Sequence, residues 1–257
     1  MGVSVRLGVV RLVAVVGTLA GICVSSIARP AMAGPPYVTD DPDPTEYRHW
    51  EIYTGFTYQN DGRGDVETTL PFAEFNYGAM PNVQVSISTE LNDADFGAER
   101  REGYGITDFG IKTRFVQESA NRPQISFYPS VAIPPAGGHI VTLLPLWLQK
   151  SSGPWTAFGG GGVYLNRGPG ARDYTFVGGA LERAISPGMT IGAELYHQGA
   201  DTLTDSDTTA ANVGMIAQVG AYHAILFSIG RSFHGENSLS AYTSYEFALG
   251  PHEAREP

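Results

Sequence analysis

The chain has 257 residues, 32 of them glycine, and a net charge of −10. It contains one cysteine, Cys23, and two lysines, Lys112 and Lys150. This composition argues against nucleic acid as a partner, because no basic patch is present to neutralise phosphates. It also leaves no cysteine pair for a disulfide framework. A soluble all-β protein and a membrane barrel are the two classes that remain.

The first 33 residues have the layout of a secretory signal peptide. Arg6 and Arg11 supply a cationic start, and the stretch from Leu12 to Ile27 is apolar and uncharged. Ala31-Met32-Ala33 then offers small residues at the positions that a signal peptidase reads, which predicts cleavage before Gly34. A retained membrane anchor is the alternative, although the run is shorter than the ~20 residues of a spanning helix. Cleavage leaves 224 residues with 13 basic and 26 acidic side chains.

Residues 34–49 form an acidic leader that we place on the periplasmic side. Asp40, Asp41, Asp43 and Glu46 could offer oxygen ligands to a cation, but their spacing matches no calcium loop, so we predict no metal site. We expect a solvated acidic tail. Folding of this segment into the mouth of a barrel stays open as the alternative.

Residues 50–249 are a series of segments in which apolar and polar residues alternate. Alternation with period 2 predicts strands that bury one face. An even number of strands of about ten residues is typical of a closed antiparallel transmembrane β-barrel, here of about 12 strands, followed by a tail at 250–257. Both registers of 172–184 carry apolar residues, so its outward face is left open. The predicted strands are 50–59, 65–77, 83–91, 104–116, 124–134, 141–150, 155–166, 172–184, 189–199, 209–219, 223–232 and 239–249.

The connections and the aromatic residues support a membrane barrel over a soluble sandwich. The links on the predicted periplasmic side are short, whereas the opposite side has the two longest loops, 92–103 and 200–208. Membrane barrels show this asymmetry. Aromatic residues stand at strand ends near one rim, where rings favour the interface between headgroups and hydrocarbon. They are Trp50, Tyr77, Phe115 and Trp155.

The polar faces of the strands carry the candidate functional residues. A charge that faces lipid costs a few kcal/mol near the midplane, so charged residues should face the lumen. We expect the opposite charges to pair across strands, either as a network that fills and closes the barrel or as the lining of a selective channel. The predicted lumen-lining residues are Glu74, Asp108, Lys112, Arg114, Gln149, Glu194 and Glu246.

The run Gly159-Gly160-Gly161-Gly162 is not a phosphate loop, because no Gly-Lys-Ser/Thr follows it. Glycines inside a strand permit a bend or the close approach of an aromatic ring. We predict no cofactor.

Several motifs carry a resemblance to a known family. They are Pro35-Pro36-Tyr37-Val38-Thr39-Asp40-Asp41-Pro42, Glu46-Tyr47-Arg48-His49-Trp50-Glu51, Glu74-Phe75-Asn76-Tyr77-Gly78, Leu144-Pro145-Leu146-Trp147-Leu148-Gln149-Lys150 and Gly153-Pro154-Trp155 with the glycine run, then Glu194 with His197-Gln198 and Ala200-Asp201. The chain resembles transporter-like outer-membrane proteins similar to the family named for the MetA pathway of phenol degradation. The resemblance covers nearly the whole mature chain and implies a barrel that passes small molecules, aromatic ones among them. One departure is that the chain continues from Gly250 to Pro257, whereas such barrels often end on an aromatic residue.

Three functional classes follow. The first is an outer-membrane channel for a small-molecule solute, with lipid and the outer-membrane assembly machinery as partners. The second is a structural barrel without an open pore. The third is an outer-membrane hydrolase, which needs a nucleophile beside an oriented base. His197 is followed by Gln198-Gly199 and not by a nearby serine, so we predict that the protein is not an enzyme.

Overall fold

The structure is a computed structural model that describes residues 36–60, 65–95, 100–135, 138–235 and 238–251. The predicted signal peptide and residues 252–257 of the predicted tail lie outside these ranges, so they stay predictions. Within the described ranges, no helix is long and apolar enough to cross a membrane.

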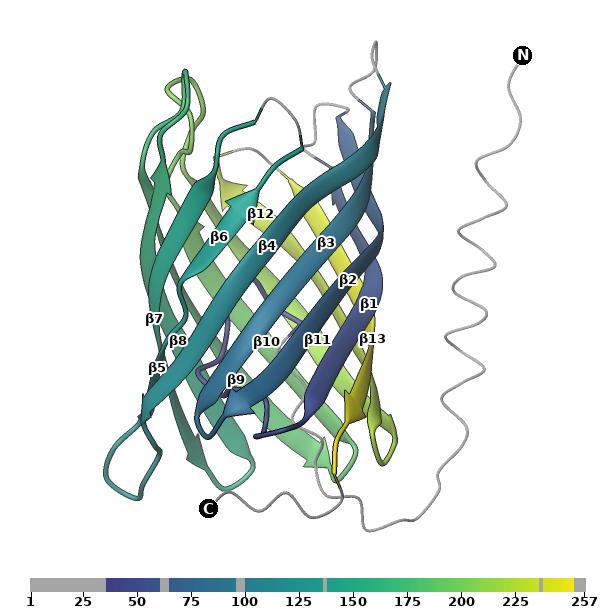
Figure 1. The fold of residues 1–257 in the computed structure, drawn as a ribbon, viewed down its shortest axis with the longest axis vertical. Coiled ribbons are helices and arrows are strands. Elements are labelled where there is room, and N and C mark those ends of the chain that lie inside the picture. Colours follow the sequence, from purple (N-terminus) through teal and green to yellow (C-terminus); the bar gives the residue numbers. More distant parts are fainter. Residues whose placement is uncertain (1–35, 61–64, 96–99, 136–137, 236–237, 252–257) are drawn as a thin grey trace, which may run out of the picture.

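The described strands form one antiparallel sheet that closes on itself (Figure 1). Strand β1 pairs with β13 from Trp50 opposite Leu249 to Asn60 opposite Leu239, and this pairing joins the first strand to the last. The strands are β1 (Trp50–Asn60), β2 (Val66–Met80), β3 (Val83–Asp95), β4 (Arg100–Val116), β5 (Gln124–Phe127), β6 (Ser130–Ile133), β7 (Val141–Ser152), β8 (Trp155–Asn166), β9 (Tyr174–Ser186), β10 (Met189–Gln198), β11 (Thr208–Gly220), β12 (His223–His234) and β13 (Leu239–Leu249).

The barrel wall has the twelve strand positions expected from the sequence, because β5 and β6 together occupy one position. Both segments pair with β4 on one side and with β7 on the other. Pro129 lies between them and has no N–H to donate to a ladder. Its carbonyl still accepts a hydrogen bond from the Ile111 N–H at 3.1 Å. The predicted strand 124–134 therefore occupies one strand position and is interrupted at Pro129.

The two faces of each strand differ as the period-2 pattern predicts. On β3, Ile87 faces outward and is 39% exposed, while Gln84 faces inward and is 4% exposed. The structure also settles β9, whose outward face the sequence left open. Phe176 points into the barrel, and Val177 points outward and is 57% exposed. An apolar exterior around a closed barrel is the surface that meets the hydrocarbon of a bilayer.

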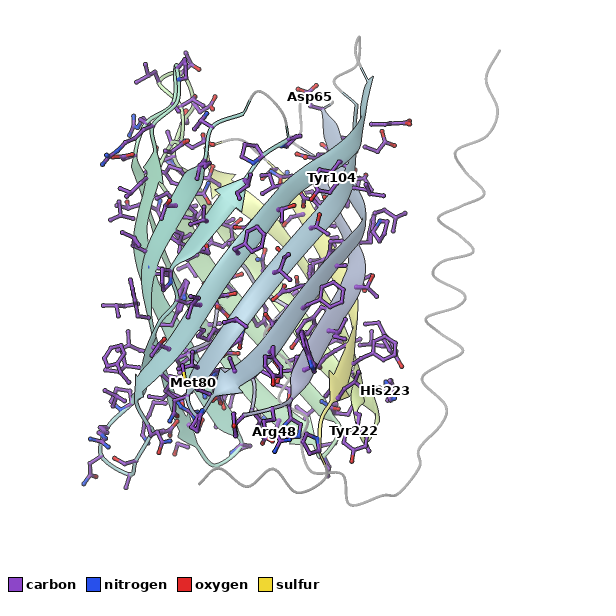
Figure 2. All side chains as sticks on the ribbon, in the orientation of Figure 1. Arg48, Asp65, Met80, Tyr104, Tyr222 and His223 are labelled. Carbon is purple, nitrogen blue, oxygen red and sulfur yellow. The ribbon has the colours of Figure 1, made fainter. Side chains whose placement is uncertain are left out.

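The barrel has one rim with tight turns, where β1 begins and β13 ends, and we call it the periplasmic rim after the side on which the sequence prediction places it. Two hairpins there turn through residues with positive φ, Asn82 at 63° and Gly153 at 58°, which these residue types tolerate. Figure 2 shows Met80 near this rim and Tyr104 near the opposite one. At that opposite end the predicted loop 92–103 is wrong, because β3 and β4 continue through most of it.

The rim aromatics predicted from the sequence lie together or face outward. The Trp50 and Tyr77 rings are 4.6 Å apart at the periplasmic rim. Phe115 is 58% exposed and Trp155 is 43% exposed, as expected for rings at a membrane interface.

Candidate functional site: the leader inside the barrel

The described part of the leader, residues 36–49, lies inside the barrel (Figure 1). Its root is fixed to β2 at the periplasmic rim. The Arg48 N–H donates to the Gly78 carbonyl at 2.7 Å, and the Gly78 N–H donates to the His49 carbonyl at 3.0 Å. The expectation of a solvated tail is therefore corrected, and the alternative of folding into the barrel is what the structure shows.

One set of leader contacts is made with cations on β4. The Lys112 ammonium donates to Asp40 Oδ1 at 3.1 Å and to the Asp41 carbonyl at 2.9 Å. Arg114 Nη1 donates to Asp43 Oδ1 at 2.5 Å. Both cations face the lumen, and Lys112 is only 5% exposed. The acidic composition of the leader is thus complementary to two basic residues of the wall.

A neighbouring contact is made with β3. The Thr45 N–H donates to Gln84 Oε1 at 2.8 Å, and both residues are buried. Gln84 in turn donates from Nε2 to Asn76 Oδ1 of β2 at 3.0 Å. This amide chain connects the leader to two adjacent strands.

The far end of the leader crosses to β10 and β11. Glu194 Oε2 accepts a hydrogen bond from the Val38 N–H at 3.2 Å, and Oε1 accepts one from the Thr39 N–H at 2.5 Å. Asn212 Nδ2 donates to the same carboxylate at 2.6 Å. Glu194 is 3% exposed, and a buried carboxylate that accepts three hydrogen bonds is well satisfied. It binds the backbone of the leader, so its role does not depend on a leader side chain.

Glycines of the wall make room for the leader. A Cβ at Gly178 would lie 2.0 Å from Thr39 Oγ1, and a Cβ at Gly192 would lie 2.6 Å from the Tyr37 hydroxyl oxygen. A Cβ at Gly214 would lie 2.8 Å from Tyr37 Cε1. These three glycines come from adjacent strands, β9, β10 and β11, and side chains at these positions would occupy the space of the leader. We call them the glycine seat.

Burial acts on the carboxyl groups of the leader. Desolvation raises the pKa of Asp40 to about 6, although the neighbouring Lys112 opposes the shift. Desolvation and the nearby Asp41 raise the pKa of Asp43 to about 6, and Arg114 opposes that shift. A proton therefore binds these two groups more tightly when the leader lies in the barrel.

A cavity of about 580 Å³ surrounds the leader. Of the described residues that line it, Lys112 alone is basic. One part of the lining is aromatic and belongs to β7, β8 and β9, where the Trp147 and Phe176 rings lie 6.0 Å apart. The acidic residues of the lining are Asp40, Asp41, Asp43, Glu51, Glu74, Asp108 and Glu182.

The structure places the predicted lumen-lining residues on the inner side of the wall. Those that line the cavity are Glu74, Asp108, Lys112 and Gln149. Arg114 binds the leader. Glu194 and Glu246 are buried, at 3% and 1% exposure, and are not part of the cavity lining.

Charge pairing differs from the expected cross-strand network. In the described part of the chain, the carboxylates that contact Lys112 and Arg114 belong to the leader and not to neighbouring strands. Sequence reasoning also missed the glycine seat. The available signal was the position of Gly192 and Gly214 on the polar faces of two consecutive strands, whereas the face of Gly178 could not be assigned from the sequence.

The histidine environment also differs from the sequence-based expectation. His197 Nδ1 lies 2.9 Å from Thr209 Oγ1, and its Nε2 lies 3.7 Å from Asp207 Oδ2. This hydroxyl–imidazole–carboxylate group includes a threonine from the paired strand β11, which sequence proximity did not indicate. His197 is not among the residues that line the lumen cavity.

The glycine run on β8 permits close approach of an aromatic ring, as the sequence suggested. A Cβ at Gly160 would lie 2.8 Å from Cε3 of the Trp147 indole ring. The ring therefore lies against the inner face of the wall and leaves space in the lumen.

Comparison with solved structures shows the same fold in outer-membrane channels. An outer-membrane channel from Pseudomonas putida F1 is 11% identical with a TM-score of 0.62, covering 89% of this chain and 100% of that chain. The KdgM porin in complex with oligogalacturonate is 10% identical with a TM-score of 0.53, covering 77% and 99%. The NanC porin is 9% identical with a TM-score of 0.52, covering 78% and 99%. No family model and no curated protein matches the chain.

These similarities concern the fold. Together with the apolar exterior, a barrel of this type places the protein in the outer membrane. The resemblance to the phenol-degradation family stays a resemblance.

Proposed function

We propose that the protein is a channel for small solutes whose bore is obstructed by its own leader. The observation that carries this proposal is the polar, cavity-lined lumen in which the leader is held by hydrogen bonds and ion pairs. Side chains that only fill a barrel would pack against one another, whereas here a separate segment occupies the centre. The aromatic part of the lining supports aromatic compounds among the solutes, in line with the family resemblance.

The leader has to leave its position in the lumen for solutes to pass. Its contacts with Glu194, Lys112 and Gln84 are polar, and water can replace polar contacts at modest net cost. The wall does not depend on these contacts for its closure, because the β1–β13 ladder is continuous from rim to rim. Release of the leader would therefore leave a closed barrel with a wider bore.

Planar-bilayer recording of the purified protein tests the proposal, with a variant that lacks residues 36–46 beside the wild type. We expect small or infrequent conductance from the wild type and a conductance at least several-fold larger from the variant. Liposome swelling with neutral sugars should follow the same order. Heat-modifiable electrophoretic mobility serves as the control that both proteins are folded barrels.

The structural barrel without a pore is the second candidate, because the leader fills part of the bore. A folded variant without residues 36–46 that neither conducts ions nor passes sugars would favour this candidate and overturn the channel proposal.

A further inference from the structure

We propose that Lys112 and Arg114, with the polar residues beside them on β5 and β7, bind the carboxylate of a small aromatic solute, and that this solute displaces the leader. The proposal rests on the proposed channel function and names a substrate class for the same lumen.

The leader occupies the two cations through carboxylates of its own. The Lys112 ammonium is 3.1 Å from Asp40 Oδ1 and 3.7 Å from Asp41 Oδ1, and Arg114 binds Asp43. Because the leader leads into the first strand and is not part of the ladder, these carboxylates can be exchanged for others. A solute carboxylate would make the same charge-assisted hydrogen bonds.

A row of unsatisfied polar groups lies beside Arg114. Ser126 is opposite Arg114 on one side and opposite Trp147 on the other, so the three residues are neighbours across β4, β5 and β7. The Ser126 hydroxyl and the Trp147 indole N–H are buried and have no hydrogen-bond partner in the described structure. Gln124 Oε1 accepts a hydrogen bond from Arg114 at 3.1 Å, and the Gln124 side chain also interacts with Asp43 of the leader.

These unpaired groups can both act as hydrogen-bond donors. The Trp147 indole N–H is a donor, and the Ser126 hydroxyl can donate as well. Buried donors without partners cost free energy. An acceptor-rich group that reaches Arg114 would satisfy both the cation and its neighbours. A carboxylate is such a group.

The aromatic part of the solute is inferred from the rings around the same cations. Lys112 Nζ lies 5.0 Å from the centroid of the Tyr128 ring, and Tyr128 and Trp147 both line the cavity. A flat ring attached to the carboxylate would contact these side chains. The remaining acidic residues of the cavity repel a polyanion, which limits the class to monocarboxylates. They are Glu51, Glu74, Asp108 and Glu182.

Leader release can be measured with a thiol placed on the leader. Thr39 is fully buried, and the predicted mature chain has no other cysteine, so a T39C thiol reacts with a water-soluble maleimide when the leader leaves its seat. Benzoate at ten times its dissociation constant should raise the labelling rate about tenfold if it binds only the released state. Benzylammonium and benzyl alcohol at the same concentration are the matched probes and should leave the rate unchanged.

Direct binding in detergent, measured by calorimetry, keeps the test falsifiable if variants loosen the leader. We expect Lys112→Gln and Arg114→Gln to weaken benzoate binding at least tenfold and Ser126→Ala to weaken it severalfold. Lys150→Gln is the matched control, because Lys150 binds Glu118 outside the cavity and should bind benzoate as the wild type does. Equal binding of benzoate by Lys112→Gln and wild type, or an equal response to benzylammonium, would overturn the proposal.

The two proposals can fail separately. Benzoate binding and T39C labelling need no pore, so they can succeed in a protein that never conducts. A conducting variant without residues 36–46, combined with a wild type that ignores benzoate, would retain the channel and reject the carboxylate site.

Discussion

The wall of the barrel and the leader inside it are held by different forces. The wall is closed by uninterrupted backbone ladders such as β7–β8, and its apolar side chains face outward. The leader has no ladder and depends on a few polar contacts, chiefly those of Glu194, Lys112 and Arg114. Our proposal that the leader detaches while the wall keeps its fold rests on this difference. Three substitutions and a change of pH should affect the wall and the leader differently.

The largest effect is expected from a charge on the lipid-facing side of the wall. Ile87→Arg should lower the free energy of unfolding in bilayers by about 2–4 kcal/mol if the side chain lies near the midplane. The neighbouring Ser88→Arg faces the cavity and should cost much less. Urea unfolding of the protein in lipid vesicles measures both. Equal losses from the two variants would contradict the assignment of the faces.

Gly178→Val should unseat the leader without opening the wall. A Cβ at this position lies 2.0 Å from Thr39 Oγ1, and overpacking of this kind costs about 1–3 kcal/mol. The T39C labelling rate should therefore rise roughly 5- to 150-fold. Gly179→Val is the control, because the atom nearest to a Cβ at this position, the Phe158 carbonyl oxygen, is 3.8 Å away. A similar rate in both variants would show that Gly178 is no part of a seat.

Glu194→Gln should loosen the leader to a smaller degree. The amide keeps the shape of the side chain but replaces charge-assisted hydrogen bonds with neutral ones, a loss of about 1–2 kcal/mol. We expect T39C labelling to be roughly tenfold faster. Glu74→Gln, whose carboxylate accepts a hydrogen bond from Asn76 of the wall, should leave the labelling rate close to that of the wild type. The reverse order of the two variants would disprove the role of Glu194.

The smallest effect is expected from pH. Burial raises the pKa of Asp40 and Asp43 to about 6 in the seated leader, above the 3.8 of the free side chain. The seated state thus holds protons more tightly, so seating is strongest below pH 4 and weakens as pH rises through 6. T39C protection should fall about threefold between pH 6 and pH 7, after correction for the intrinsic reactivity of the thiol. The D40N/D43N variant should lose most of this dependence, and an unchanged profile would contradict it.

The wall could be predicted from the sequence because its determinants are local. Alternation along β3 and β10 assigns each residue to one face, and this pattern needs no knowledge of the neighbouring strands. Even the interruption of the strand 124–134 has a local cause, because Pro129 has no N–H to donate to a ladder. The outward face of β9 could not be assigned, because Phe176 and Val177 are both apolar and only closure of the barrel distinguishes them.

The leader could not be placed by the same reasoning, because its position depends on residues far away in the chain. Asp40 and Lys112 are separated by 72 positions, and an acidic segment alone is equally compatible with solvent. The residues of the wall that match the leader were visible in the sequence, but on separate strands. Two inward-facing cations on β4 match the acidic leader, and inward-facing glycines such as Gly178 and Gly214 match its width.

The anchored root of the leader also makes the molecule directional. Because Arg48 and His49 are tied to Gly78 beside the rim where β1 begins, a detached leader pivots about that rim and swings out through the same end. Whatever captures, cleaves or modifies the loose segment must then approach from that compartment. From the opposite rim, the leader can be reached only by solutes that enter the lumen there.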